Sequence, residues 1–380
     1  MSSTSTWPKV FLGEICEFKY GKGLPAKSRI PGPFGVYGSN GAVGSHIEAA
    51  TLGPTIIVGR KGSFGEVHYS DAPCWPIDTT YYVDASATEC DLRWLAYRIS
   101  SLGLTSLNRA AAIPGLNRED AYRQTLLLPP LVEQRRIAQV LDQVDTLRAK
   151  RRGTLTMLDN LAQSIFLDMF GSPLTNPMGW PVRPLGELGR VTTGNTPSRS
   201  ETGNYGSAIE WIKSDNIDRS SIYLRRASEG LSVAGMKTAR IVETGSLLVT
   251  CIAGSPASIG NVAIANRRVA FNQQINALTP SNTDSLFLYF QLCLAKPLVL
   301  EKSTGGMKGL VSKSRFESLI LLDPPPALQA DFTERVRAVL QLQSVQHSHL
   351  AELDALFASL QHRAFRGELW PEGPAPAPAA

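Results

Sequence analysis

Residues 131–152 read LVEQRRIAQVLDQVDTLRAKRR, and the interpretation of the whole chain starts from this stretch. Its apolar residues recur three and four positions apart, which is the pattern of one face of an α-helix. The same steps continue to residue 169, so the sequence predicts one long helix over 131–170 with an apolar, coiled-coil-like seam. The seam includes Ile137, Leu141, Leu155, Leu158 and Ile165.

The pattern returns 195 residues later and predicts a second long helix over 327–366. Both seams are interrupted at matching positions by two polar residues, which are Arg148 and Arg151 in the first copy and Gln343 and Gln346 in the second. A Trp-Pro-x3-Leu-Gly-Glu motif also occurs twice, at 7–14 and at 180–187. The chain is therefore an internal repeat. The second seam includes Phe332, Val336, Leu350, Leu353 and Leu360.

Each long helix follows a globular segment, at 1–130 and at 176–326. Short β-prone runs such as 55–58, 79–83 and 246–249 alternate with glycine-rich turns, and one helix is expected in each segment, at 91–98 and 286–294. The predicted fold class is α+β, with two segments of many strands and few helices alternating with two long helices. Gly115-Leu116 and Gly309-Leu310 match at a spacing of 194, which indicates one further small insertion or deletion. The Pro- and Ala-rich end, 367–380, is expected to be a disordered tail.

Composition limits the class of protein. The net charge of +5 and pI near 8.9 suit a polyanionic partner without requiring one. Neither a long apolar run nor a signal peptide is visible, so we expect a cytoplasmic protein without membrane association. The five scattered cysteines indicate reduced thiols, and we expect neither a metal site nor a catalytic site. Residues 323–326, DPPP, are similar to the DPPY motif of adenine methyltransferases but lack its aromatic residue, and no glycine-rich methyl-donor motif is present.

Several motifs resemble the specificity subunits of type I restriction–modification systems. LPPLVEQRRIA opens the first helix at 128–138, MFGSP and NPMGW follow that helix at 169–173 and 176–180, and AFRGEL closes the second at 364–369. VYGSNG at 36–41 and IIVGRKGS at 56–63 resemble the family's target recognition domains. The resemblance covers nearly the whole chain.

The resemblance implies a non-catalytic DNA reader. Residues 1–130 and 176–326 would be target recognition domains that each read half of a split double-stranded target, and the two helices would pack antiparallel as a spacer. Two modification subunits, carrying S-adenosylmethionine for adenine methylation, would bind the helices, and restriction subunits, carrying ATP and Mg, would join them. The expected partner contacts are Glu133, Gln134 and Gln329; the second copy departs from the first because Leu328 stands in place of the glutamate.

DNA contacts are expected from loops of the globular segments, because cationic groups bind phosphates and amide or hydroxyl groups pair with base edges. Asn and Gln suit adenine edges in particular. The candidates in the first segment are Lys22, Lys27, Ser39, Asn40, Arg60, Lys61 and Ser63. The candidates in the second are Asn195, Arg199, Lys213, Asn272, Gln273 and Lys308.

Several interpretations stay open at this level. Arg148 and Arg151 contact phosphate between the half-sites, lie in a solvated or partner-facing patch in mid-helix, or form a polar layer that sets the register with Gln343 and Gln346. The seam of about 50 Å, at about 1.5 Å per residue, is long enough to hold two readers a turn of DNA apart. The alternatives to a DNA-reading subunit are a self-contained DNA methyltransferase and a coiled-coil scaffold without a DNA role.

Overall fold

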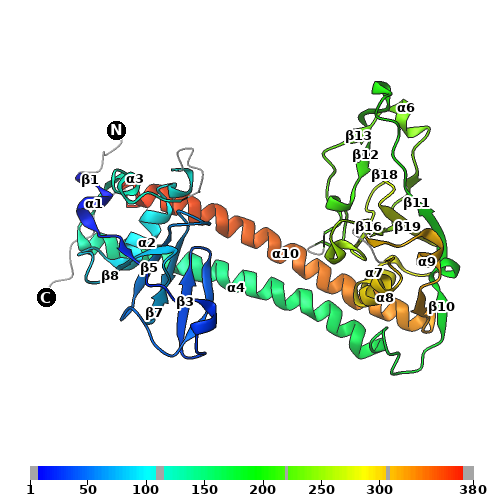
Figure 1. Cartoon of the computed structure of the whole chain (residues 1–380), viewed down its shortest axis with the longest axis horizontal. Helices are drawn as coiled ribbons and strands as arrows, with labels where there is room; N and C mark the ends of the chain where they lie inside the picture. The colour runs from blue at the N-terminus through cyan, green and yellow to red at the C-terminus, as the bar shows by residue number, and fades with distance from the viewer. Residues whose placement is uncertain (1–6, 108–114, 219–220, 305–308, 371–380) are drawn as a thin grey trace. The chain divides into compact units, whose positions relative to one another are not determined.

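The computed structural model describes residues 7–107, 115–218, 221–304 and 309–370 (Figure 1). The chain forms two compact units: unit 1 comprises Met1–Arg152 with Ser348–Ala380, and unit 2 comprises Gly153–His347. Two long helices, α4 (Leu131–Phe170) and α10 (Pro326–Ala364), each contribute one half to either unit. Each unit therefore combines one globular segment with halves of both helices.

The two helices pack along the predicted seam, and none of the seam positions is exposed. In unit 1 the start of α4, at Ile137 and Leu141, shares a core with the end of α10, at Leu360 and Ala364. In unit 2 the end of α4 instead meets the start of α10 in one core. The helices are consequently antiparallel, as the family resemblance implied. None of the helices in the described ranges is long and apolar enough to cross a membrane.

Glycine and proline mark the helix ends. Gly171 follows α4 with a φ of 72°, a left-handed conformation that favours glycine after a helix. Pro326 opens α10, where its fixed φ suits the first helical turn. The expected disordered tail is wrong at its start: Leu369 and Trp370 pack against the core of unit 1, and the Arg136 guanidinium lies 4.0 Å from the Trp370 ring centroid. Residues 371–380 lie outside the described part of the chain.

Unit 1 builds its globular segment from short strands around one four-stranded antiparallel sheet, in the order β2-β8-β5-β6. A second sheet, β4-β3-β7, contains the parallel pair β3·β7. β1 pairs with β9 next to the start of α4. The elements are β1 (Lys9–Phe11), α1 (Leu12–Ile15), β2 (Lys19–Tyr20), the 3-10 helix η1 (Ala26–Ser28), β3 (Phe34–Gly38), β4 (Gly41–His46), β5 (Thr55–Gly59), β6 (Val67–Ser70), β7 (Cys74–Pro76), β8 (Thr80–Asp84), α2 (Leu92–Ser100), η2 (Leu104–Ser106), α3 (Arg118–Tyr122) and β9 (Thr125–Leu127).

Unit 2 repeats this plan with sheets β11-β19-β15-β17 and β13-β12-β18-β14, and its parallel pair is β12·β18. β10 pairs with β21, and β16 with β20. The elements are β10 (Val182–Pro184), α5 (Leu185–Leu188), β11 (Gly189–Thr193), η3 (Thr202–Asn204), β12 (Tyr205–Ile212), η4 (Ser214–Asn216), β13 (Gly230–Leu231), α6 (Val233–Met236), β14 (Ile241–Val242), β15 (Leu247–Thr250), β16 (Ile252–Ala253), η5 (Pro256–Ser258), β17 (Val262–Ile264), β18 (Val269–Phe271), β19 (Ile275–Pro280), α7 (Ser285–Leu294), α8 (Lys296–Glu301), β20 (Gly309–Leu310), α9 (Lys313–Glu317) and β21 (Ile320–Leu322).

The equivalent helices α2 and α7 show why the repeat folds alike. Each begins after an aspartate whose carboxylate caps the helix: Asp91 accepts a bond from the Trp94 N–H and Asp284 from the Leu286 N–H. Each then buries its apolar face against α4 and α10. In unit 2 this contact is a cluster of phenylalanines in which the Phe332 ring lies 5.4 to 6.1 Å from Phe166, Phe170, Phe287 and Phe290.

Hydrogen bonding corrects one match between the repeats. The Leu116 N–H donates to the Arg60 carbonyl, and the Val311 N–H donates to the equivalent carbonyl of Cys251. Leu116 therefore corresponds to Val311, at the same spacing of 195 as the helices, and not to Leu310. The further insertion or deletion inferred from the Gly-Leu pairs is wrong, because a two-residue motif was aligned one residue out of register.

Candidate nucleic-acid interface

Most of the predicted DNA-contacting residues gather around one loop in each unit. Turn 1, residues 76–80, joins β7 to β8, and turn 2, residues 271–275, joins β18 to β19. In each turn one carbonyl accepts bonds from two N–H groups that directly follow a strand. After β5, Arg60 and Lys61 donate to Thr79, and after β15, Cys251 and Ile252 donate to Gln274. The two turns are therefore held by the same backbone contacts.

A glycine packs directly against each turn. The Gly21 N–H donates to Thr80 at 3.1 Å, and the Gly194 N–H donates to Ile275 at 3.1 Å. A Cβ atom at Gly21 would lie 2.0 Å from the Ile77 carbonyl oxygen, and one at Gly194 would lie 2.1 Å from the Asn272 carbonyl oxygen. Only glycine permits this approach. The two glycines are 173 residues apart, as the two Trp-Pro-x3-Leu-Gly-Glu motifs are, and the structure shows the physical reason for this match.

Turn 1 collects four of the predicted side chains. Arg60 donates from Nη2 to the Asp78 carbonyl at 2.6 Å, and its guanidinium lies 5.2 Å from the Tyr20 ring centroid. The Lys22 ammonium lies 5.4 Å from the Trp75 ring centroid. Lys61 is exposed beside Arg60. Cations interleaved with aromatic rings are the composition expected of a surface that binds nucleic acid.

Ser39 is the fourth, and its hydroxyl donates to the Thr79 carbonyl at 2.6 Å. Its side chain is buried, so it supports the turn and does not present a hydroxyl to a base edge. Asn40 is exposed at the neighbouring β3–β4 hairpin, and Ser63 is half-buried in the β5–β6 loop. Lys27 is exposed in η1 and has no contact with turn 1 among the described interactions. Lys308 lies outside the described residues.

Turn 2 carries amides at its tip. Gln273 is exposed and hydrogen-bonds the Thr196 hydroxyl, whereas Asn272 is buried and donates from Nδ2 to Gln274 Oε1 at 2.8 Å. Asn195 is tied to the backbone, because Nδ2 donates to the Thr238 carbonyl and Oδ1 accepts from the Arg240 N–H. Of these predicted contacts, only Gln273 faces solvent at the tip of the turn.

The cations of this site surround an aromatic residue that the sequence prediction missed. The Arg199 guanidinium and the Lys213 ammonium lie 5.7 and 5.2 Å from the Trp211 ring centroid. Both cations also bond the Glu229 carboxylate, at 2.9 and 2.7 Å, and the hydrogen bonds from Lys213 and Arg199 lower its pKa. Trp211 lies two residues before Lys213, which was predicted to contact DNA. This closeness in sequence was the signal that could have identified Trp211 as part of the site.

A hollow of about 520 Å³ opens beside turn 2. Charged, amide and aromatic groups meet in it, which suits a polyanion with stacking bases. Within the described ranges, no three His, Cys, Asp or Glu side chains gather as a metal ion would require. The lining residues are Thr196, Arg199, Trp211, Ile252, Ala253, Gly254, Asn272, Gln273 and Gln274.

The residues predicted to contact partner subunits turn inward. Gln134 accepts from the Asp91 N–H at 2.8 Å and donates to the Pro129 carbonyl at 2.9 Å. Gln329 donates to the Pro324 carbonyl at 2.7 Å, and Glu133 accepts from Arg136 at 3.1 Å. All three predicted residues are buried. These contacts favour a role in fixing each helix to its own segment, and a partner contact there stays a prediction.

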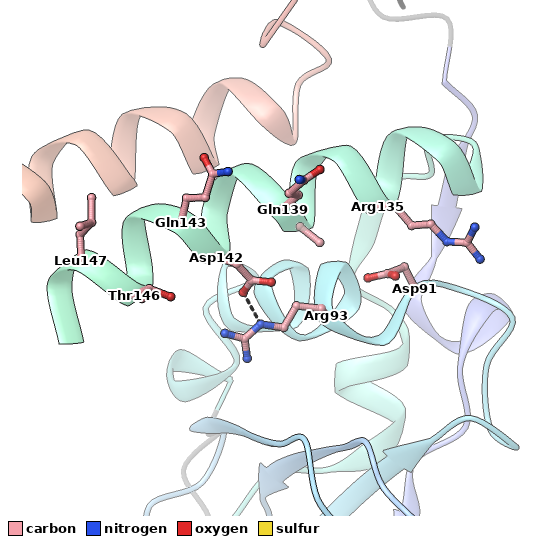
Figure 2. Close-up of a pocket in the computed structure, with 9 residues that line it drawn as sticks. Asp91, Arg93, Arg135, Gln139, Asp142, Gln143, Thr146 and Leu147 are labelled. Carbon is pink, nitrogen blue, oxygen red and sulfur yellow. Dashed lines mark hydrogen bonds and ion pairs between the residues drawn. The ribbon is translucent and has the colours of Figure 1, made fainter. Parts of the chain in front are cut away.

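A groove of about 680 Å³ lies instead on the outer side of the first half of α4 (Figure 2). Arg93, from α2, points toward α4 and pairs there with Asp142, as Figure 2 shows. Burial raises the pKa of the neighbouring Tyr69 hydroxyl to about 12, so this ring stays neutral beneath the Arg93 guanidinium. Exposed Leu147 lines the end of the groove.

The comparisons with known proteins agree with this architecture. A family model described as the type I restriction modification DNA specificity domain matches residues 4–156 and 177–353. The chain is 27% identical over 204 residues to the type I restriction enzyme HindI specificity subunit of Haemophilus influenzae, covering 51% of this chain and 42% of the relative. It is 24% identical over 298 residues to the EcoKI specificity subunit of Escherichia coli, covering 70% and 62%. The matched regions thus span less than two thirds of either relative.

Two solved structures share the fold. The S subunit of a type I restriction–modification system from M. genitalium has a TM-score of 0.63 at 15% identity, covering 96% of this chain and 97% of that one. A chain from a structure addressing complex assembly and conformational transition of the type I R-M system has a TM-score of 0.56 at 17% identity, covering 97% and 100%. Since the family model matches both repeats and most of the sequence, the chain belongs to the family of type I restriction–modification DNA specificity proteins.

Proposed function

We propose that this chain is the DNA-reading, non-catalytic specificity subunit of a cytoplasmic type I restriction–modification complex. Each globular segment reads one half of a split double-stranded target, through the surface around turn 1 or turn 2. The observation that carries the proposal is the twin arrangement itself: two equivalent backbone turns are surrounded by cations, aromatic rings and amides. Because the side chains on the two turns differ, the two half-sites differ in sequence.

The helix pair carries the partner subunits in this proposal. Leu147 and Leu342 correspond in the repeat, as do Leu161 and Leu356, and all of them are exposed. Each directly precedes a seam position, so each stands beside the packed face and not within it. Equivalent exposed leucines in both units suit two copies of one partner. We assign that partner as the modification subunit, which supplies S-adenosylmethionine, and restriction subunits with ATP and Mg join the assembly.

A self-contained methyltransferase is disfavoured by the surroundings of the DPPP segment. The Asp323 N–H donates to the Pro181 carbonyl at 2.7 Å, and its carboxylate pairs with Arg183 at 2.5 Å. These contacts tie Asp323 to β10, and Asp323 does not line any of the three pockets found in the part of the chain that the structure describes.

The proposal is tested with the chain co-purified with its modification subunits. Genome-wide mapping of methylated adenines in cells that express this complex gives the target, and gel-shift titrations then compare that target with a scrambled sequence. We expect tighter binding to the bipartite target, and equal binding of both DNAs would refute the assignment. Methyl transfer by the purified chain alone would favour the methyltransferase alternative.

A second experiment tests whether the exposed leucines of the two long helices bind the modification subunits. The double variant Leu147→Glu with Leu356→Glu places two charges on the exposed helix face of unit 1. The double variant Leu161→Glu with Leu342→Glu places two charges on the equivalent face of unit 2. We expect native mass spectrometry to show one modification subunit lost in either double variant. Retention of both subunits in both variants would locate the docking surface elsewhere.

A further inference from the structure

The two units differ at one corner of the repeat, where α2 in unit 1 and α7 in unit 2 meet the two long helices. In unit 1 this corner is filled by an aromatic stack. The Phe357 ring lies 5.7 Å from the Tyr97 ring, and the Arg148 guanidinium lies 4.4 Å from the Phe357 ring centroid. Arg148 also bonds Asp354 from Nε at 2.6 Å. The stack closes unit 1 between α2 and the two long helices.

The equivalent corner of unit 2 keeps the polar contact and loses the ring. Gln343 stands in place of Arg148 and donates from Nε2 to Asp159, the counterpart of Asp354, at 2.8 Å. Phe290 of α7 stands in place of Tyr97, counted from the capping aspartates. Ala162 stands in place of Phe357. Unit 2 therefore has the equivalent polar pair and the ring of α7 around this corner, but no aromatic side chain at the position of Phe357.

A cavity of about 640 Å³ occupies this corner of unit 2. Its floor is apolar and buried, formed by Ala162, Val262, Tyr289 and Phe290. The cavity is partly open to solvent, so a ligand that enters it removes apolar surface from water. The volume lies within the range of pockets that hold small ligands.

The rim of the cavity is polar. Asp159, Gln163, Ser344 and His347 come from the two long helices. Lys296 approaches from α8 and donates to the Ala257 carbonyl and to Asn261 Oδ1. An apolar floor beneath polar groups suits a ring that carries a hydrogen-bonding edge, such as an indole or a phenol.

We propose that this cavity binds one aromatic ring, seated where Phe357 stands in the other unit. The ring comes either from a small molecule or from the side chain of a bound subunit, and both sources present the same chemistry to the site. The inference does not depend on DNA recognition, because it follows from comparing two equivalent corners of one chain.

Indole is the probe, because it joins a planar apolar ring to one N–H donor. Its binding to the full chain is measured by saturation-transfer NMR and by the alkylation rate of Cys293, which lines the cavity. We expect indole to slow alkylation of Cys293 and to leave Cys90, a half-buried thiol of unit 1, unchanged. No binding of indole to the wild-type chain would overturn the proposal.

Ala162→Phe supplies the missing ring from within. We expect this variant to retain its helical circular dichroism and to lose at least tenfold in indole affinity. The matched control is Asn160→Phe, which adds the same ring at an exposed position of α4 outside the cavity lining, and it should bind indole normally. Should Ala162→Phe fail to fold, Ala162→Val, which fills less of the space, should give a partial loss. Unchanged affinity in a folded variant would refute the assignment.

The source of the ring is decided with the chain bound to modification subunits. If a subunit provides the ring, the complex no longer binds indole, and Cys293 in the complex is protected from alkylation even without indole. If the ring belongs to a free molecule, the complex binds indole as the isolated chain does. Either outcome supports the cavity as an aromatic site, provided that Ala162→Phe removes indole binding in the isolated chain.

Discussion

Replacing Lys61 and Arg60 separately by alanine distinguishes contact with DNA from support of turn 1. Lys61 is exposed, and the described interactions give its side chain no partner. If its ammonium neutralises one phosphate, Lys61→Ala lowers the slope of log affinity against log salt by about 0.9. Between 50 and 200 mM salt, the ratio of the variant's Kd to that of the wild type should then fall about 3.5-fold. The free energy of unfolding should not change.

Arg60→Ala should lower the stability of the fold as well as the affinity for DNA. It removes a charged hydrogen bond to the Asp78 carbonyl, of about 1.5–3 kcal/mol, and a cation–π contact with Tyr20, of about 0.5–1 kcal/mol. Because the guanidinium is only partly buried, we expect about 1–3 kcal/mol less free energy of unfolding, together with weaker DNA binding.

Fluorescence anisotropy at four salt concentrations gives the slopes, and urea unfolding gives the stabilities. Lys9→Ala, at an exposed lysine on β1 in the same unit, is the matched control and should leave both quantities unchanged. A wild-type salt slope in Lys61→Ala would contradict the phosphate contact. An unaltered stability in Arg60→Ala would contradict the structural role assigned to its guanidinium.

Three further changes probe the fold. Phe332→Ala removes a fully buried ring that touches four others, so we expect the free energy of unfolding to fall by about 3–5 kcal/mol in urea titrations; a loss below 1 kcal/mol would show that the cluster does not hold unit 2 together. Gln134→Ala leaves the Pro129 carbonyl and a helix-capping N–H unpaired and should cost about 1–3 kcal/mol, whereas a neutral effect would mean that water replaces both bonds. The hydrogen bond from Arg267 lowers the pKa of Glu210 below its ordinary value of 4.5. The ionised Glu210 carboxylate therefore stabilises the folded state fully above pH 4.5, and this stabilisation is lost as the pH falls through the lowered pKa. Glu210→Gln should therefore flatten the acid side of the stability–pH curve in melts between pH 3 and 6, and an unchanged acid side would argue against that coupling.

The two long helices could be predicted from the sequence because helical periodicity is a pattern among residues close together in the chain. Steps of three and four residues identify α4 and α10, and a second copy repeats every polar interruption. Strands such as β5 and helices such as α2 were also visible, in a β-branched run and an aspartate cap. The fold class and the internal repeat follow from these signals, whereas the antiparallel pairing of the two helices was expected only from the family resemblance.

The candidate site was only partly predictable, because it depends on pairing between distant strands. Turn 1 exists where β3 runs parallel to β7, and no local pattern announces that pairing. Sequence pattern selected Ser39 and Asn272 for their chemistry, yet packing buries both. Ala162 and Phe357 occupy equivalent apolar positions of the two seams, so the pattern does not distinguish them, yet the small side chain of Ala162 lines a cavity in unit 2.

The short ladders β1·β9 and β10·β21 have a consequence for how this protein changes over time. Each ladder pairs the entrance of a globular segment with its exit: Lys9 lies opposite Leu127, and Val182 opposite Leu322. Since both ends of a segment are neighbours, a change inside the segment need not alter where the chain enters and leaves the long helices. Such a segment can be lengthened, shortened or exchanged for another, provided that its helix α2 or α7 still packs against α4 and α10. Under the proposed function, a new DNA specificity then requires a new globular segment on unchanged long helices.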